Sequence, residues 1–260
     1  MTRTQRTILL ALPIQAAIIF VFFYLTKYWF IGIALQAGMT MLLMRQLLTK
    51  GNNLIIVAKS LQPFAFVSTI SLYNLLLAQL YGVSLQVFLI QTLVASVLYG
   101  IFSYVALRQR MSVGFASVLT ILQISLSVNF VSLAMAYWRI PTFIMLPLSI
   151  VAIGYFAMWW LLEIGKNESN VPLVSAVFAL LATELIWVYS HWVIVYQVPY
   201  VNLVITQTTA VVVALAYGLG GIYYHRGNKP VRLQLIVEYM LVFIVIFLAT
   251  LVSTRWINGI

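Results

Sequence analysis

Long apolar runs occupy almost the whole chain and leave only short polar connections between them. A transmembrane helix needs roughly 20 residues to cross the hydrocarbon core of a bilayer. Nine runs approach or exceed that length: residues 7–26, 28–48, 61–81, 85–107, 113–137, 141–162, 171–195, 200–224 and 233–253. Only 7% of the residues are charged, whereas a soluble domain carries about a quarter. The sequence therefore predicts an all-α bundle of about nine transmembrane helices in a lipid bilayer, forming one integral membrane domain over residues 1–260.

Prolines and short polar turns mark the predicted boundaries. Five prolines fall at or near the starts of runs, where a missing backbone N–H costs little: Pro63, Pro141, Pro172, Pro199 and Pro230. Pro13 and Pro147 lie inside runs and predict kinks or locally open backbone. The first run is longer than the apolar region of a signal peptide and is expected to remain as a membrane anchor.

The lysines and arginines predict the orientation of the chain. With a cytoplasmic amino terminus, eleven of them lie inside: Arg3, Arg6, Arg45, Lys50, Lys59, Arg108, Arg110, Lys166, Arg226, Lys229 and Arg232. Three lie outside: Lys27, Arg139 and Arg255. Cytoplasmic loops collect basic residues, so we expect the amino terminus inside, the carboxyl terminus outside, and a multi-pass protein of the cell membrane, most simply a bacterial inner membrane.

Missing residue types exclude several chemistries. The chain contains no cysteine and no aspartate, and its four acidic residues are dispersed glutamates. Magnesium-dependent lipid transferases need clustered carboxylates, because a hard cation takes several oxygen ligands at once. No nucleophile elbow, phosphate loop or zinc-hydrolase motif is present. We therefore expect no enzyme activity, cofactor or metal. The net charge of +10 is explained by the cytoplasmic loops, so we expect no nucleic-acid partner.

Glu184 and His191 are the main candidates for function, because ionisable side chains inside a transmembrane helix are costly and usually have a role. They are separated by seven residues, close to two helical turns, and therefore share one helix face. Thr183, Trp187 and Ser190 flank them. We expect this face to point into the bundle, where it either forms a polar track or is only packed and hydrogen-bonded.

Glu238 and Tyr239 are a second pair of candidates, near the start of the last run. The connection before them is basic and contains Arg226, Lys229 and Arg232. A carboxylate near a helix start interacts favourably with the positive end of the helix dipole. We expect Glu238 to form an ion pair or a capping interaction there.

Small and aromatic residues predict two further features. Three pairs of small residues have a four-residue spacing that allows close helix contact: Ala34 and Gly38, Ala214 and Gly218, and Ala216 and Gly220. Trp159 and Trp160 are expected at the membrane interface, where tryptophan is enriched.

Four segments in the carboxyl-terminal third carry a family resemblance: Glu184–Ser190, Gly221–His225, Val237–Tyr239 and Thr254–Trp256. This part of the chain resembles uncharacterised multi-pass membrane proteins of small-genome candidate-phylum bacteria. The resemblance implies no particular activity. It nominates six positions for testing: Glu184, Trp187, Glu238, Tyr239, Arg255 and Trp256.

Two classes of function fit these observations. The first is a non-enzymatic membrane scaffold or subunit that binds another membrane protein or a lipid, as the short loops and missing catalytic motifs favour. The alternative is a small-solute or proton-coupled permease or channel, whose polar track would pass Glu184 and His191. The sequence predicts no oligomeric state.

Overall fold

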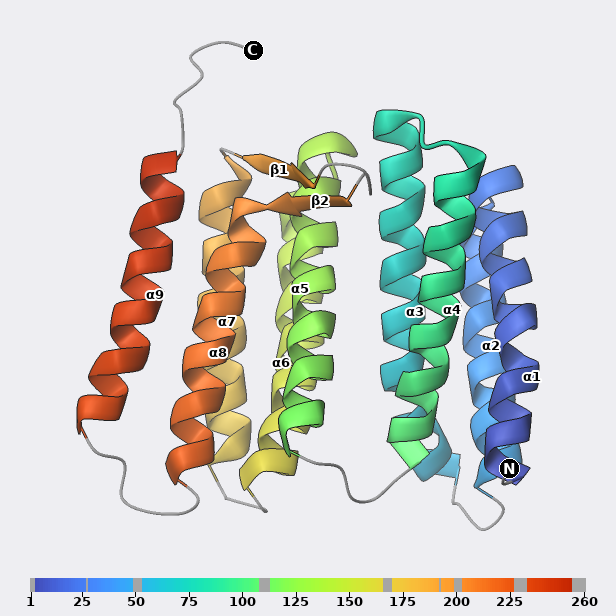
Figure 1. The fold of residues 1–260 in the computed structure, drawn as a ribbon, viewed down its shortest axis with the longest axis horizontal. Coiled ribbons are helices and arrows are strands. Elements are labelled where there is room, and N and C mark those ends of the chain that lie inside the picture. Colours follow the sequence, from blue (N-terminus) through green and yellow to red (C-terminus); the bar gives the residue numbers. More distant parts are fainter. Residues whose placement is uncertain are drawn as a thin grey trace. The chain divides into compact units, whose positions relative to one another are not determined.

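Helices make up most of the described chain (Figure 1). The computed structural model describes residues 3–26, 28–48, 53–107, 113–165, 170–191, 193–198, 203–226 and 233–253. Its helices are α1 (Arg3–Ile18), the π-helical segment η1 (Ile19–Leu25), α2 (Trp29–Leu47), α3 (Asn53–Tyr81), α4 (Leu85–Leu107), α5 (Val113–Tyr137), α6 (Thr142–Gly165), α7 (Val171–Ser190), α8 (Gln207–Arg226) and α9 (Leu233–Ser253). Its strands are β1 (Val195–Val198) and β2 (Leu203–Thr206).

Seven helical segments in the described ranges are long and apolar enough to cross a membrane, with α1 and η1 forming one of them. They correspond to the first seven predicted spans, and the chain is thus a multi-pass, mainly α-helical protein. The last two predicted spans also contain helices, α8 and α9. However, α8 begins with the polar residues Gln207, Thr208 and Thr209, and the apolar part of α9 found here, Ile236–Thr250, is shorter than a full span.

Several predicted boundaries were wrong. α3 begins at Asn53 rather than at residue 61, so Pro63 lies inside a helix and not at its start. α7 ends at Ser190 rather than at 195, and α8 begins at Gln207 rather than at 200. The segment between α7 and α8 contains the two strands instead of helix ends. This segment is rich in valine, isoleucine and tyrosine, which favour strands, but its apolar character resembles that of the helices on either side.

The described chain forms two compact units. Unit 1 contains α1, η1, α2, α3 and α4, and unit 2 contains α5 to α9 with both strands. Within each unit, consecutive helices run antiparallel (Figure 1). The prediction that residues 1–260 form one integral membrane domain remains a prediction.

A buried polar network links three helices of unit 1. The Gln36 side chain of α2 donates from Nε2 to Ser71 Oγ (2.9 Å) and accepts at Oε1 from Ser68 Oγ (3.2 Å). Tyr99 of α4 donates its hydroxyl to Thr40 Oγ1 (3.2 Å). Both interactions involve α2, so this helix is held to α3 and to α4 by hydrogen bonds between side chains.

The first span changes its helical geometry partway along. α1 continues through Pro13, and the wider π-helical turns of η1 follow from Ile19. η1 carries Phe23, which is fully buried. A side chain at Gly32 of α2 would overlap the Phe23 ring, so glycine at this position allows α2 to approach η1 closely.

Trp160 is a packing centre of unit 2. Its side chain is buried, and its Nε1 donates to Ser117 Oγ of α5 (2.9 Å). Its ring also lies against Gly220 of α8, where any side chain would overlap it. The small residue on α8 leaves room for the indole inside the unit, and the expected position of Trp160 at the membrane interface stays a prediction. Of the glycines expected at close helix contacts, Gly220 lies against the Trp160 ring and Gly218 near Tyr239 of α9, whereas a side chain at Gly38 would meet no atom within 4 Å.

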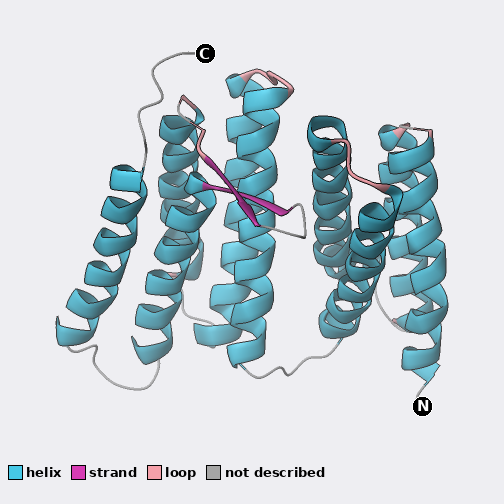
Figure 2. Ribbon diagram, turned by 45° about the horizontal axis from the view of Figure 1, so that its top comes forward, coloured by secondary structure: helices cyan, strands magenta, loops and turns pink. Residues whose placement is uncertain are grey.

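A β-hairpin connects α7 to α8 (Figure 2). β1 and β2 pair antiparallel, with Val195 opposite Thr206 and Val198 opposite Leu203. The Gln207 N–H donates to the Ile194 carbonyl (2.9 Å) and extends this ladder into the first residue of α8. Backbone groups of alternate residues in such a ladder point to opposite sides. Val204 and Thr206 therefore direct their backbone groups to the edge of β2 that β1 does not cover.

Asn129 of α5 satisfies this second edge. Its Nδ2 donates to the Val204 carbonyl (2.6 Å), and its Oδ1 accepts from the Thr206 N–H (2.7 Å). The same oxygen accepts from Thr209 Oγ1 (3.2 Å), and Thr206 and Thr209 hydroxyls also contact each other (2.8 Å). A single buried side chain thus takes the place of a neighbouring strand. Gln207 Nε2 donates to the Thr250 carbonyl (3.2 Å) and ties the same region to α9.

We predict that Asn129→Leu lowers the free energy of unfolding by about 2 kcal/mol or more, because it removes the buried hydrogen bonds of Asn129 to the Val204 carbonyl and the Thr206 N–H. Thermal unfolding of the detergent-solubilised protein measures this change. Gln123→Leu on the same helix is the matched control: Gln123 is buried, its Oε1 has no partner, and its Nε2 only contacts Ser127 Oγ at 3.3 Å. Equal destabilisation by both substitutions would contradict the role of Asn129 as a strand substitute.

We predict that Gly220→Ala destabilises the protein by about 1–3 kcal/mol, since the added methyl group overlaps the buried Trp160 ring. Gly38→Ala in α2 is the control, because a methyl group there meets no other atom within 4 Å. Alanine is also the better helix former, so Gly38→Ala should leave stability unchanged or raise it slightly. The same unfolding measurement compares the two, and a tolerated Gly220→Ala would show that Trp160 can move.

Candidate functional site

The structure places Glu184 and His191 on the outer face of α7. Both side chains are exposed, as is Trp187 between them. They share one helix face as predicted, but the expectation that this face points into the bundle was wrong. The inward face of α7 carries Ala182 and Ile186, which are fully buried. The seven-residue spacing places Glu184 and His191 on the same face of α7. Which face of α7 packs inward depends instead on the small and apolar residues of the opposite side.

Apolar side chains surround Glu184 along this outer face. Leu173, Val177 and Leu180 precede it on the same side of α7, and each is about half exposed or more. Within the described part of the chain, Glu184 takes part in no hydrogen bond and no ion pair. Glu184 is therefore the single acidic residue on an otherwise apolar stripe.

The helix direction keeps the Glu184 carboxyl group away from the nearer helix end. Glu184 lies about 20 Å along the axis from the first residue of α7 and about 9 Å from the last, at a rise of 1.5 Å per residue. Side chains on a helix tilt toward its amino terminus. For Glu184 this direction leads toward the middle of the span, so the carboxyl group cannot easily reach the closer surface.

His191 has a local role at the end of α7. Its Nδ1 lies 2.9 Å from the Trp187 carbonyl, and its ring packs edge-to-face on the Trp187 indole with centroids 5.4 Å apart. Ser190 Oγ donates to the same carbonyl (2.6 Å). These contacts satisfy a carbonyl that the helix end leaves without a backbone partner. His191 is about 10 Å along the axis from Glu184, so the two residues do not form a contact pair.

Glu238 and Tyr239 differ in their surroundings. Glu238 is exposed on α9, about 8 Å from the start of that helix, and its side chain tilts toward this nearer end. Tyr239 packs against Gly221 of α8 and edge-to-face on Tyr217, with ring centroids 5.5 Å apart. The expected basic partners Lys229 and Arg232 lie outside the described residues, as do Arg255 and Trp256.

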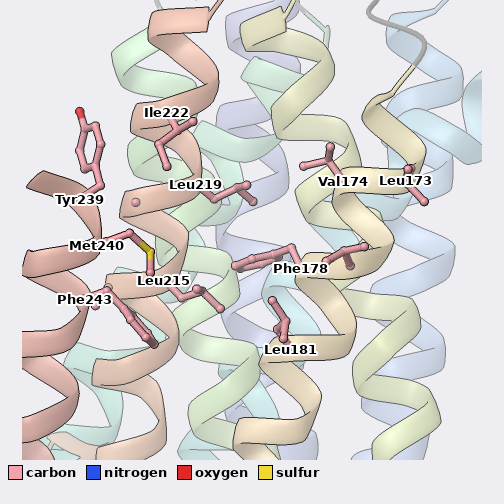
Figure 3. A pocket seen from close by; sticks show the side chains of 13 residues that line it. Leu173, Val174, Phe178, Leu181, Leu215, Leu219, Ile222, Tyr239, Met240 and Phe243 are labelled. Carbon is pink, nitrogen blue, oxygen red and sulfur yellow. The ribbon is translucent and has the colours of Figure 1, made fainter. Parts of the chain in front are cut away.

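An apolar groove of about 310 Å³ lies beside this face, between α7, α8 and α9 (Figure 3). Residues of α8 form the floor of the groove, and residues of α7 and α9 form its two walls. The lining residues are Leu173, Val174, Val177, Phe178, Leu181, Ala214, Leu215, Gly218, Leu219, Ile222, Tyr239, Met240 and Phe243. Its volume is at the lower end of the range for small-molecule sites.

The groove and the Glu184 stripe are continuous. Leu173 and Val177 line the groove and also belong to the exposed stripe of α7, and Leu181 lies one turn before Glu184. Sequence reasoning did not identify this groove, because its walls come from three separate helices. The glycines of α8 were the available signal: Gly218 and Gly221 allow Tyr239 of α9 to lie against α8.

Within the described ranges, no three histidine, aspartate or glutamate side chains come together as metal ligands would. The arrangement can instead bind apolar groups in the groove and one polar or charged group at Glu184.

Comparison with known proteins adds no relative: no family model, no curated protein and no solved structure matches this chain.

Proposed function

We propose that the protein is a non-enzymatic membrane scaffold or subunit that binds another membrane protein through the outer face of α7. The observation that carries this proposal is the exposure of Glu184 among apolar side chains, well inside a helix of membrane-spanning length. An ionisable side chain within the hydrocarbon region costs roughly 2.5 kcal/mol or more at mid-depth. Such residues normally face the inside of a bundle or pair with another group. A second protein seated on α7 supplies that environment.

The permease alternative has lost its main support. It depended on Glu184 and His191 lining a polar track inside the bundle, and both side chains are exposed on the outside. The groove next to them is lined almost entirely by apolar atoms, with Tyr239 as its only polar side chain. Such a surface favours packing of apolar groups over conduction of a polar solute.

The full topology belongs to this proposal. Nine spans, with the amino terminus in the cytoplasm of a bacterial cell and the carboxyl terminus outside, are supported by the distribution of basic residues. The antiparallel order of helices within each unit is consistent with alternating connections (Figure 1). In this topology α8 and α9 both cross the membrane, and the hairpin lies toward the outer surface.

Reporter fusions test this topology. Fusions after Lys50, Arg110 and Lys229 are expected to report a cytoplasmic location, and a fusion at the carboxyl terminus an external one. A cytoplasmic carboxyl terminus would show that the span count is even and that nine is wrong.

Site-specific photo-crosslinking in intact cells tests the binding role. A photoreactive amino acid at Leu180, on the stripe beside Glu184, is expected to form one discrete adduct with another membrane protein. The control position is Val151 on α6, which is also exposed in unit 2 but carries no acidic neighbour in its helix turn. Glu184→Leu should remove the Leu180 adduct. Adducts with lipid alone at both positions would contradict a protein partner on α7.

A further inference from the structure

We propose that the partner on α7 is a transmembrane helix of a different protein that carries a lysine or arginine at the depth of Glu184. This inference rests on the proposed function and specifies the chemistry of the partner. It also places apolar side chains of the same helix in the groove between α7, α8 and α9.

Charge complementarity points to a basic residue. Glu184 is the only charged side chain on the stripe formed with Leu173, Val177, Leu180 and Trp187, and it has no partner within the described part of the chain. In an apolar environment, a carboxylate is best stabilised by an opposite charge within a few ångströms. A partner helix without a basic residue would bury the Glu184 carboxyl group and give it no opposite charge. The partner helix is therefore expected to carry a basic residue opposite Glu184 and apolar residues along the rest of the stripe.

A second copy of this chain does not provide that cation. Every lysine and arginine lies near an end of an apolar run or outside the runs, and none lies at the middle of one. In a symmetric dimer within one membrane, the same surface of each copy meets its counterpart. Glu184 would then face Glu184, which is a repulsive pairing. The surface thus discriminates against self-association and favours a different protein.

The groove sets the register of the partner helix. It extends along the amino-terminal half of α7, from Leu173 to Leu181, and its middle lies about two turns before Glu184. A space of about 310 Å³ is too small for a helix, which is about 10 Å across, but it accepts large aliphatic side chains. The partner should therefore carry such side chains about two turns from its basic residue.

Synthetic single-span peptides provide the probe. The full chain is reconstituted in phosphatidylcholine vesicles with a fluorescent polyleucine peptide that contains one lysine at the depth of Glu184, and association is measured by energy transfer. An otherwise identical all-leucine peptide is the reference. The lysine peptide is expected to bind about fivefold more tightly or better, in line with the strength of polar contacts between membrane helices.

Three variants test whether the tighter binding of the lysine peptide depends on Glu184 and on the groove. Glu184→Gln is expected to abolish the advantage of the lysine peptide, and unfolding measurements should confirm that the variant still folds. Glu238→Gln is the matched control, because Glu238 is an exposed glutamate near a helix start and should leave the advantage unchanged. Leu219→Trp fills the floor of the groove and is expected to weaken both peptides equally.

The outcomes separate this inference from the proposed function. Equal binding of the two peptides, or equal loss with Glu184→Gln and Glu238→Gln, overturns the basic-partner inference. Energy transfer between labelled copies of the chain that Glu184→Gln abolishes overturns it in favour of self-association. If the Leu180 adduct persists while the lysine preference is absent, the scaffold role stands and only the chemistry of the partner is wrong. Loss of both results removes both proposals.

Discussion

The need to satisfy every backbone hydrogen bond inside a membrane governs this structure. Lipid offers no donors or acceptors, so spanning segments are helices, and irregular backbone is tolerated only where protein surrounds it. The hairpin between α7 and α8 shows how surrounding protein can satisfy backbone that is not helical. A two-stranded hairpin leaves two edges unpaired, and Asn129 closes one of them by bonding to Val204 and Thr206. The same side chain accepts from Thr209 and so also contacts the first turn of α8.

Sequence patterns predicted the helices well and their termination poorly. Seven predicted spans coincide with helices of membrane-spanning length, because apolar length is a direct physical requirement of the bilayer. The hairpin was missed, since the valines and isoleucines that favour a strand also satisfy the pattern of a transmembrane helix. The role of Asn129 was equally hidden: its partners are backbone groups about 75 residues away, and no local spacing encodes such a contact.

The candidate site illustrates the same limit. The seven-residue spacing correctly grouped Glu184 with His191, but nothing in that spacing indicates which side of α7 is buried. Ala182 and Ile186 determine this side by packing inside unit 2. The packing of Trp160 was hidden for a related reason: its burial depends on the missing side chain of Gly220, on a helix about 60 residues later. The role of a residue whose contacts lie far away in the sequence can be recognised only once the packing of the helices is known.

The order of the helices along the chain has a consequence for assembly. The groove needs α9 as its second wall, and α9 packs on α8 within unit 2. Because α9 follows α7 and α8 in the sequence, it is synthesised after both. For that interval α7 and α8 present a wide apolar surface, which a neighbouring helix can approach from the side. The docking of α9 on α8 then narrows this surface to the groove.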